Sequence, residues 1–431
     1  MLRDLPGTRN FEIGTPFFSA IVDSITCAAH LEPLNNSTPQ LVTLVALTVF
    51  SDKGKLSPRY IPRLLLHREE QLDTLARIFD LHDLSRTHLT PVQLVGGVGT
   101  GKTCTAILFA EQLTERAIAK SIDLKHIYVN LKLQGGSRVV LYRYLVEKAA
   151  PEAYSGSMSA EELIRGLVNN LVRNRKYLLI TVDEIDYFIK HTKEHLVYDL
   201  TRLNELSPGE ASAVVGVVFI AKGKDYHGFL EKAEISTLGR FSIDFPTYTA
   251  SQIYDIIEKR AEESIKRGAI SEEVMRYIAD LTAEKPVNGD IRHALDLLLY
   301  SGNLADNRGS GHIELDHVRR VHGETHHMIT SEDLLNLPEV EMYALMAVIR
   351  ALKVKRMPYV TLKDIRASLQ ILSEEHEMKP LFDVEEHLQD LHDRGIIEVA
   401  SLTRIGISGA PAEQLETFLD AVIRRAEEPR G

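Results

Sequence analysis

The sequence contains no tryptophan and only two cysteines, Cys27 and Cys104, among its 431 residues. Two cysteines are too few for a disulfide framework or for a zinc site built on cysteine, which is typical of a protein in a reducing compartment. Positive charge is also scarce, because 50 Lys and Arg residues face 61 Asp and Glu residues, giving a formal net charge of −11. This balance argues against a protein that coats nucleic acid by charge alone, but it does not exclude a local DNA-binding face.

Long apolar runs are lacking as well. The longest one, residues 40–50, is shorter than the roughly 18 residues that suggest a membrane span. The first residues include Asp4 and Glu12, and they lack the basic, apolar and small-residue order of a secretory signal. We therefore expect no membrane association and a cytoplasmic location.

The length and the pattern of the chain predict several domains. Residues 1–48 show no sustained periodicity, and we treat them as an N-terminal extension of unknown role. Beyond residue 68, helix-period segments alternate with short runs rich in Val, Ile and Leu, which indicates a parallel sheet covered by helices. The expected strands are 91–95, 126–131, 177–183 and 213–221, and the expected helices between them include 102–119, 138–149 and 160–173.

Two further domains are expected after this α/β core, which spans residues 49–246. Helices follow one another without strands from about residue 250, which predicts an all-helical lid at 247–330. Residues 331–431 then contain expected helices at 339–353, 361–373 and 382–394, followed by two short strands. Three helices and a hairpin predict a C-terminal winged helix-turn-helix.

The segment "LVGGVGTGKTC" at residues 94–104 carries the clearest chemical signal. Gly96, Gly101, Lys102 and Thr103 match the pattern G-x-x-x-x-G-K-[ST], with an apolar strand before it and a helix after it. In such a phosphate-binding loop, backbone N–H groups surround the phosphates, Lys102 reaches the β- and γ-phosphates, and the Thr103 hydroxyl binds Mg²⁺. Cys104 follows on the helix as a small packing residue beside the nucleotide. The nucleotide-binding residues expected here are Gly96, Gly97, Val98, Gly99, Thr100, Gly101, Lys102, Thr103 and Cys104.

A second half of the site is expected at "LLITVDEID", where acidic residues follow a buried strand. Asp183 is placed to hold the Mg²⁺ together with Thr103. Glu184 is placed to polarise the water that attacks the γ-phosphate. Asp186 has an alternative role as the N-cap of the following helix.

These motifs together make the chain resemble an AAA+ ATPase. The segments "YIP", "HREEQ", "GGVGTGKT", "VDEID" and "NGDIRHALDLL" are similar to those of the archaeal replication initiators related to the origin recognition complex and the cell-division-cycle helicase loader. The resemblance covers about residues 50–400. It implies an AAA+ P-loop core, ATP or ADP between sheet and lid, and a lid arginine, Arg292, that contacts the γ-phosphate. The residues that it places near the adenine are Tyr60, Ile61, Pro62, His67, Arg68 and Glu69.

The chain departs from this family in two places. The family usually has a polar residue after the fourth strand to orient the attacking water, and a gapless reading puts Lys222 there. A lysine can contact the γ-phosphate, but it cannot accept a hydrogen bond from the water. The family's proline–arginine pair is also missing, with Lys232 or Arg240 as substitutes. We therefore expect a slow ATPase whose bound nucleotide acts as a switch.

The expected DNA contacts are less clear than the nucleotide site. The insertion after the second strand contains Arg138, Arg143 and Lys148, which fit either a DNA contact or a solvated helix face. The C-terminal domain from Glu339 onward has 12 Lys and Arg against 17 Asp and Glu, a net charge of −5. Because phosphate contacts dominate DNA affinity, this is a poor face for tight duplex binding. The alternative is a basic edge formed by Arg350, Lys353, Lys355, Arg356, Lys363, Arg366 and Arg404.

The sequence thus leaves two functions open. The first is an ATP-dependent, chromosome-associated replication initiator that binds double-stranded origin DNA and helps to load the replicative helicase. Its expected partners are the helicase or other initiator subunits, and it could form an oligomer on DNA. The second is a regulatory AAA+ ATPase of the same ancestry whose winged helix binds a protein partner. A continuous basic stripe on the C-terminal domain favours the first, and scattered charges favour the second.

Overall fold

The computed structural model describes residues 48–79, 89–134, 137–192, 194–208, 212–239, 241–325, 329, 331–376 and 384–427. The predicted N-terminal extension, residues 1–48, lies outside the described residues except for Thr48, as does Arg240. None of the helices within the described ranges combines the length and the apolar character needed to cross a membrane.

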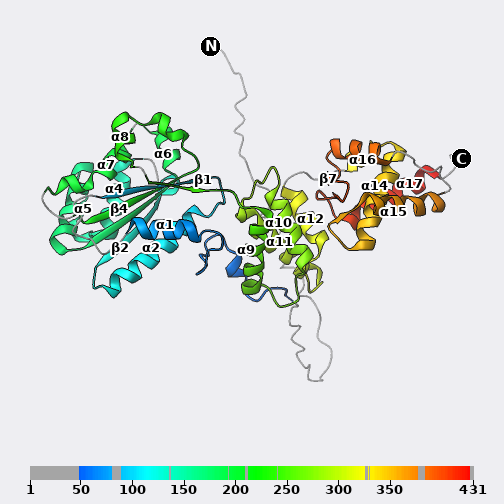
Figure 1. The fold of residues 1–431 in the computed structure, drawn as a ribbon, viewed down its shortest axis with the longest axis horizontal. Helices are drawn as coiled ribbons and strands as arrows, with labels where there is room; N and C mark the ends of the chain where they lie inside the picture. The colour runs from blue at the N-terminus through cyan, green and yellow to red at the C-terminus, as the bar shows by residue number, and fades with distance from the viewer. Residues whose placement is uncertain are drawn as a thin grey trace, which may run out of the picture. The chain divides into compact units, whose positions relative to one another are not determined.

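A five-stranded parallel sheet with strand order β2-β3-β4-β1-β5 organises the first domain (Figure 1). The carboxyl ends of parallel strands meet at one edge of a sheet, and ligands bind there. Because β4 lies between β1 and β3, the segment after β4 lies between the loop after β1 and the carboxylates after β3. The strands are β1 (Thr90–Gly96), β2 (Leu124–Asn130), β3 (Tyr177–Asp183), β4 (Val214–Ala221) and β5 (Phe241–Phe245). The first four were expected, whereas β5 was not.

Helices cover both faces of the sheet. Successive side chains of a strand point to opposite faces, so apolar residues on each face need a covering layer. In β3, Leu178 and Ile180 pack into one buried cluster and Leu179 packs into the other. The Leu179 face is covered by α1 (Glu69–Ile78) and α2 (Lys102–Ala119). The opposite face is covered by α4 (Arg138–Ala149), α5 (Ala160–Asn174), α6 (Ile185–His191) and α7 (Leu196–Thr201). Two short helices, α3 (Leu131–Gln134) and α8 (Lys232–Thr237), complete this domain.

The lid contains four helices with their own buried cluster: α9 (Ala250–Ser264), α10 (Glu272–Ala283), α11 (Ile291–Arg308) and α12 (Leu315–Thr325). The first described residues join this cluster through Val49, Phe50 and Leu56, which are all buried. The backbone N–H of Val49 donates to Asp306 Oδ1 at 2.6 Å. Residues 49–56 therefore pack against the lid, although the sequence pattern groups them with the nucleotide-binding core at 49–246.

The C-terminal domain has the elements of the predicted winged helix-turn-helix. Its helices α14 (Glu339–Lys355), α15 (Leu362–Glu375) and α16 (Val384–Asp393) share one buried cluster with the sheet. The antiparallel sheet has the order β6-β8-β7, formed by β6 (Tyr359–Val360), β7 (Glu398–Ser401) and β8 (Arg404–Gly406). Thr361 caps α15 by accepting a hydrogen bond from the N–H of Asp364. Two helices outside the prediction, α13 (Ser331–Leu335) and α17 (Ala412–Glu427), flank this unit.

Candidate nucleotide-binding site

The loop between β1 and α2 has a backbone that requires glycine at two positions. Gly99 and Gly101 have φ values of 67° and 88°, in the left-handed region. A Cβ atom at Gly99 would lie 1.7 Å from Asp290 Oδ1, and one at Gly101 would lie 2.7 Å from the Tyr248 hydroxyl oxygen. Asp290 precedes lid helix α11. The loop is therefore packed directly against the start of that helix.

Lys102, the first residue of α2, is directed back along the loop. Its Nζ donates to the carbonyl oxygens of Gly96 and Gly97, each at 2.6 Å. Burial lowers the pKa of Lys102, and the nearby Asp183 carboxylate opposes this shift. A cation held here, beside the unpaired N–H groups of the first turn of α2, creates a positive region at the sheet edge.

Three oxygen atoms meet at the carboxyl end of β3. The Thr103 hydroxyl and the Tyr128 hydroxyl both donate to Asp183 Oδ2 at 2.8 Å. Asp183 is 7% exposed, so these contacts take the place of water around its carboxylate. Burial raises the pKa of Tyr128, with the Asp183 charge as the second cause. Thr103 and Asp183, the predicted metal ligands, are therefore adjacent, and Tyr128 in β2 joins them without having been predicted.

Glu184 and Lys222 approach each other across the neighbouring strand ends. Glu184 has a left-handed backbone with φ 59°, and its N–H donates to Asp183 Oδ1 at 2.8 Å. Lys222 directly follows β4, and its Nζ lies 3.3 Å from Glu184 Oε2. The strand order thus brings the expected base and the unusual lysine together. Helix α6 begins at Ile185 with Glu184 as its N-cap residue, so Asp186 is not the N-cap.

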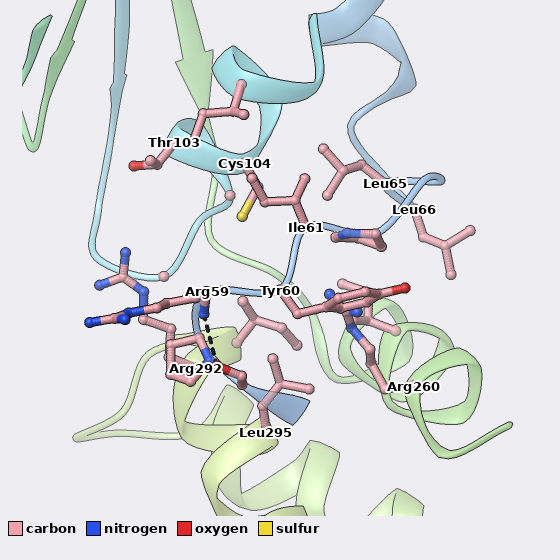
Figure 2. Close-up of a pocket in the computed structure, with 18 of the residues that line it drawn as sticks. Arg59, Tyr60, Ile61, Leu65, Leu66, Thr103, Cys104, Arg260, Arg292 and Leu295 are labelled. Atoms are coloured by element: carbon pink, nitrogen blue, oxygen red, sulfur yellow. Dashed lines mark hydrogen bonds between the residues drawn. The ribbon is translucent and has the colours of Figure 1, made fainter. Parts of the chain in front are cut away.

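A cavity of about 370 Å³ lies between this loop, the segment at 57–66 and the lid (Figure 2). Tyr60, Ile61 and Pro62 line it together with Leu295 of α11 and Arg260 of α9. The loop contributes Gly99, Thr100, Gly101, Lys102, Thr103 and Cys104, whereas Gly96, Gly97 and Val98 are not among the described residues that line the cavity. An apolar wall next to a positively charged loop suits a flat base joined to phosphates.

Arg292 lines the same cavity from the second position of α11. Its backbone N–H donates to Asp290 Oδ1 at 3.0 Å, which fixes the start of the helix beside the loop. Arg59 also lines the cavity, and Figure 2 shows the side chains of Arg59 and Arg292 projecting toward the same side of it. Arg59 was not predicted, because an arginine beside "YIP" has no distinguishing sequence signal.

His67 and Arg68, which the resemblance places near the adenine, make contacts with the lid and with the phosphate-binding loop. Neither is among the described residues that line the cavity. His67 Nε2 lies 2.8 Å from Asp255 Oδ2 in α9. Arg68 is 2% exposed, its Nε donates to the Thr100 carbonyl at 2.9 Å, and its guanidinium carbon lies 3.8 Å from the centre of the Tyr248 ring. Arg68 therefore stabilises the phosphate-binding loop through contacts with Thr100 and Tyr248.

Comparisons with known proteins agree with this arrangement. Residues 66–224 match the model of an AAA domain, and residues 254–323 match that of a Cdc6 AAA+ ATPase-type lid domain. The chain is 34% identical over 301 residues to "ORC1-type DNA replication protein 1" of Aeropyrum pernix, covering 67% of this chain and 72% of that protein. The chain belongs to the ORC1-type family of DNA replication proteins.

Solved structures of this ORC1/Cdc6 family have the same fold. The crystal structure of Cdc6p from Pyrobaculum aerophilum aligns with a TM-score of 0.71 at 26% identity, covering 88% of this chain and 99% of that one. The Aeropyrum pernix ORC1 protein, solved in complex with DNA, aligns with a TM-score of 0.55 at 27% identity, covering 88% and 98%. The predicted fold class, an AAA+ core with a parallel sheet, a helical lid and a C-terminal domain, is that of the family.

The basic residues expected to contact DNA in this ORC1-type chain are mostly engaged in ion pairs. In the insertion, Arg138 lies 3.1 Å from both Asp199 Oδ2 and Glu161 Oε1. In the C-terminal domain, Lys355 Nζ lies 2.9 Å from Asp364 Oδ1. Other ion pairs that involve these expected residues are Arg350 with Glu375, Lys353 with Glu416, Arg366 with Glu385, and Arg404 with Asp280 of the lid. Most of the basic residues from which an edge was expected are therefore paired with carboxylates.

Proposed function

We propose that this chain is an ATP-dependent replication initiator that binds double-stranded origin DNA and uses its nucleotide state as a switch. The observation that carries this proposal is the pair formed by the Thr103 hydroxyl and the Asp183 carboxylate, 2.8 Å apart. Lys102 and Arg292 line the adjoining cavity. Assistance in loading the replicative helicase rests on family membership alone.

The residues present fit both ATP and Mg²⁺. Tyr60, Ile61 and Pro62 would form a wall for the adenine, and the backbone N–H groups of the loop would hold the phosphates. The Thr103 hydroxyl and the Asp183 carboxylate are the hard oxygen ligands that Mg²⁺ prefers. Bound Mg²⁺ would supply positive charge to the β- and γ-phosphate oxygens. Lys102 would release the Gly96 and Gly97 carbonyls to donate to the same phosphates.

Slow hydrolysis follows from the contact between Glu184 and Lys222. A base must accept a hydrogen bond from the attacking water. The ammonium group of Lys222, 3.3 Å from Glu184 Oε2, competes with water for that oxygen. Lys222 has no acceptor of its own for the water. The site therefore favours retention of the nucleotide over rapid turnover.

Arg292 is the residue through which the lid would sense the γ-phosphate. It is the second residue of α11, and the Ile291 N–H, one residue earlier, faces the Gly99 carbonyl at 3.4 Å. A permanently charged guanidinium on a separate helical unit binds the triphosphate more strongly than the diphosphate. This difference in affinity would shift the position of the lid.

A second function is favoured by the charge arrangement of the C-terminal domain. Several of its basic side chains are paired with carboxylates, and helix α16 carries Glu385, Glu386, Asp390 and Asp393. Such a surface suits a basic protein partner better than a duplex. A regulatory ATPase that docks with a protein through this domain is therefore the alternative.

The nucleotide site is tested by replacing its lysine. We expect Lys102→Ala to weaken both ATP and ADP binding by roughly 10- to 100-fold, because hydrogen bonds to a charged group contribute about 1.5–3 kcal/mol. Isothermal titration calorimetry with each nucleotide measures this change. Lys120→Ala is the matched control, since Lys120 is an exposed lysine at the other end of α2. Equal affinities in the two variants would overturn the assignment of the site.

A further inference from the structure

A cluster of metal-ligating side chains lies in the C-terminal domain, outside the nucleotide site. It joins Glu341 of helix α14 to His387 and Asp390 of helix α16. One ligand atom from each of the three lies within 4.8 Å of the other two. His387 and Asp390 are three residues apart, so they lie on the same face of α16. The cluster therefore connects two helices through three groups of the kind that hold metal ions.

Glu341 is buried in a way that its protein surroundings do not fully explain. The residue is 5% exposed, and its Oε2 has no hydrogen-bond partner in the described part of the chain. His387 Nδ1 is a second buried atom without a hydrogen-bond partner there. A buried carboxylate oxygen without a hydrogen-bond partner destabilises the folded chain, because it has lost its hydration without compensation. Both residues belong to the cluster, and each therefore has a ligand atom directed to the same place as well as an unpartnered buried atom.

Arg394 compensates the Glu341 charge only in part. Its Nε lies 3.3 Å from Glu341 Oε2, but the geometry is not that of a hydrogen bond. The Arg394 side chain is 46% exposed, so its interaction is screened by solvent. The arginine is thus a competitor for the same carboxylate, and its partly exposed side chain would have to leave Glu341 when a metal ion binds.

We infer that Glu341, His387 and Asp390 form a binding site for a divalent transition-metal ion of the Zn²⁺ type. One imidazole nitrogen and two carboxylates are a donor set that Zn²⁺ uses, whereas Mg²⁺ prefers oxygen alone. With a neutral imidazole the three side chains carry two negative charges, which one divalent ion neutralises. Three protein ligands leave a coordination position for water.

A metal ion bound at this site would hold α16 in place and reduce the negative charge of this helix. The ion would tie α16 to α14, two helices that otherwise meet through apolar contacts such as those of Leu388 and Leu391. It would also neutralise Asp390 on the helix that a winged helix-turn-helix presents to its partner. Metal loading would therefore alter both the rigidity and the charge of that surface.

The test is a titration of the full chain with ZnCl₂, without nucleotide and after removal of metal by a chelator. We expect one Zn²⁺ ion to be bound per chain at this site and to be lost in His387→Ala. The affinity should fall by more than the roughly 10- to 100-fold that loss of an outer partner costs. His392→Ala is the matched control, because His392 lies in the same helix with its Nδ1 3.2 Å from the Ile397 carbonyl and outside the cluster. Comparison of the two variants separates this site from other histidines of the chain.

Two further variants control for misfolding and test whether Arg394 competes with the metal ion for Glu341. Asp390→Asn changes an exposed ligand, so it should keep the circular dichroism spectrum of the parent while losing the same ion. Arg394→Gln should tighten Zn²⁺ binding, because it removes the cation beside Glu341. If Zn²⁺ stoichiometry and affinity are the same in the parent, His387→Ala and Asp390→Asn, the site does not exist. A weaker affinity in Arg394→Gln would also contradict the inference.

Discussion

At the scale of single residues, we expect the arginine at the start of α11 to distinguish ATP from ADP. Arg292 lines the cavity beside the loop, and no part of ADP extends as far as the γ-phosphate of ATP. We expect Arg292→Ala to weaken ATP binding by roughly tenfold, the loss of one charged hydrogen bond, and ADP binding by less than about twofold. Competition titrations of both nucleotides measure the ratio. Arg308→Ala, at the exposed end of the same helix, should change neither affinity, and an equal loss for ATP and ADP would mean that Arg292 does not sense the γ-phosphate.

Tyr128 is expected to position the carboxylate of Asp183. Its hydroxyl donates to the same oxygen that accepts from Thr103. Tyr128→Phe should raise the Mg²⁺ concentration needed for half-maximal ATP hydrolysis by roughly tenfold, the usual cost of losing an outer partner of a metal ligand. The ATP affinity without Mg²⁺ should not change. Steady-state hydrolysis over a range of Mg²⁺ concentrations measures the shift.

The control for this variant is Tyr142→Phe, which removes a similar buried bond elsewhere. The Tyr142 hydroxyl donates to Asp199 Oδ2 at 2.6 Å, in a part of the core outside the residues that line the cavity. We expect this variant to lose stability and to keep the parental Mg²⁺ dependence. An unshifted Mg²⁺ dependence in Tyr128→Phe would show that Asp183 is oriented without it.

The predictability of the site residues depended on whether their signal was local. Lys102, Thr103 and Asp183 could be found because their motifs follow buried strands, and parallel strands bring those ends together. Tyr128 could not be found, since a tyrosine in "HIYVNL" looks like any half-buried strand residue. Arg68 was assigned to the adenine from its local motif, but its closest aromatic partner, Tyr248, lies far along the chain. Contacts between residues that are so far apart along the chain leave no recognisable pattern in a single sequence.

At the scale of elements, strand β2 carries a histidine that makes the sheet sensitive to acid. His126 Nε2 lies 2.9 Å from Thr181 Oγ1 in β3, and burial lowers the pKa of His126 to about 4. In the unfolded chain the pKa is about 6.5. Between these values the unfolded state binds the extra proton, so stability is complete above pH 6.5 and is lost as the pH falls toward 4. The loss from this group is at most about 3 kcal/mol, because one pKa unit corresponds to about 1.4 kcal/mol.

We therefore expect the midpoint of thermal unfolding to fall between pH 6.5 and 4, and to fall less in His126→Gln. A glutamine keeps a polar group near Thr181 without titrating. Scanning calorimetry at several pH values provides the comparison. His312→Gln, an exposed histidine, is the control, and it should follow the parental curve. Parallel curves for the parent and His126→Gln would rule out His126 as the group responsible.

Most elements of the fold were predictable, and the exceptions have physical reasons. Three of the four predicted strands, β1, β3 and β4, lie in the interior of the sheet, where a parallel sheet covered on both faces requires mainly apolar residues. The fourth, β2, lies at one edge, and its short run "IYV" still marked it as a strand. Strand β5 has five residues, with the polar Ser242 and Asp244 alternating with apolar ones, and it lies at the sheet edge. Its pattern is too short to separate it from a loop. Helix α17 was missed because it follows the winged helix-turn-helix, where the expected domain pattern was already complete.

At the scale of the whole molecule, the net charge of −11 and the ion pairs of the C-terminal domain oppose unassisted DNA binding. Exposed ion pairs of this kind contribute only about 0–1 kcal/mol each. Phosphates can therefore replace the carboxylates as partners of residues such as Arg366 or Lys355. The molecule can still bind a duplex, but every such contact depends strongly on salt.

The measurement that tests the central claim most directly is fluorescence anisotropy of labelled duplex DNA with the full chain. It is made at several salt concentrations, with ATP, with ADP and without nucleotide, and repeated with Lys102→Ala. The account predicts that affinity differs between ATP and ADP, falls steeply with salt by a slope of about 0.9 per phosphate contacted, and loses its nucleotide dependence in Lys102→Ala. Absence of binding at low salt, or binding that is the same in every nucleotide state, would contradict a nucleotide-switched DNA-binding initiator and favour the ATPase that docks with a protein.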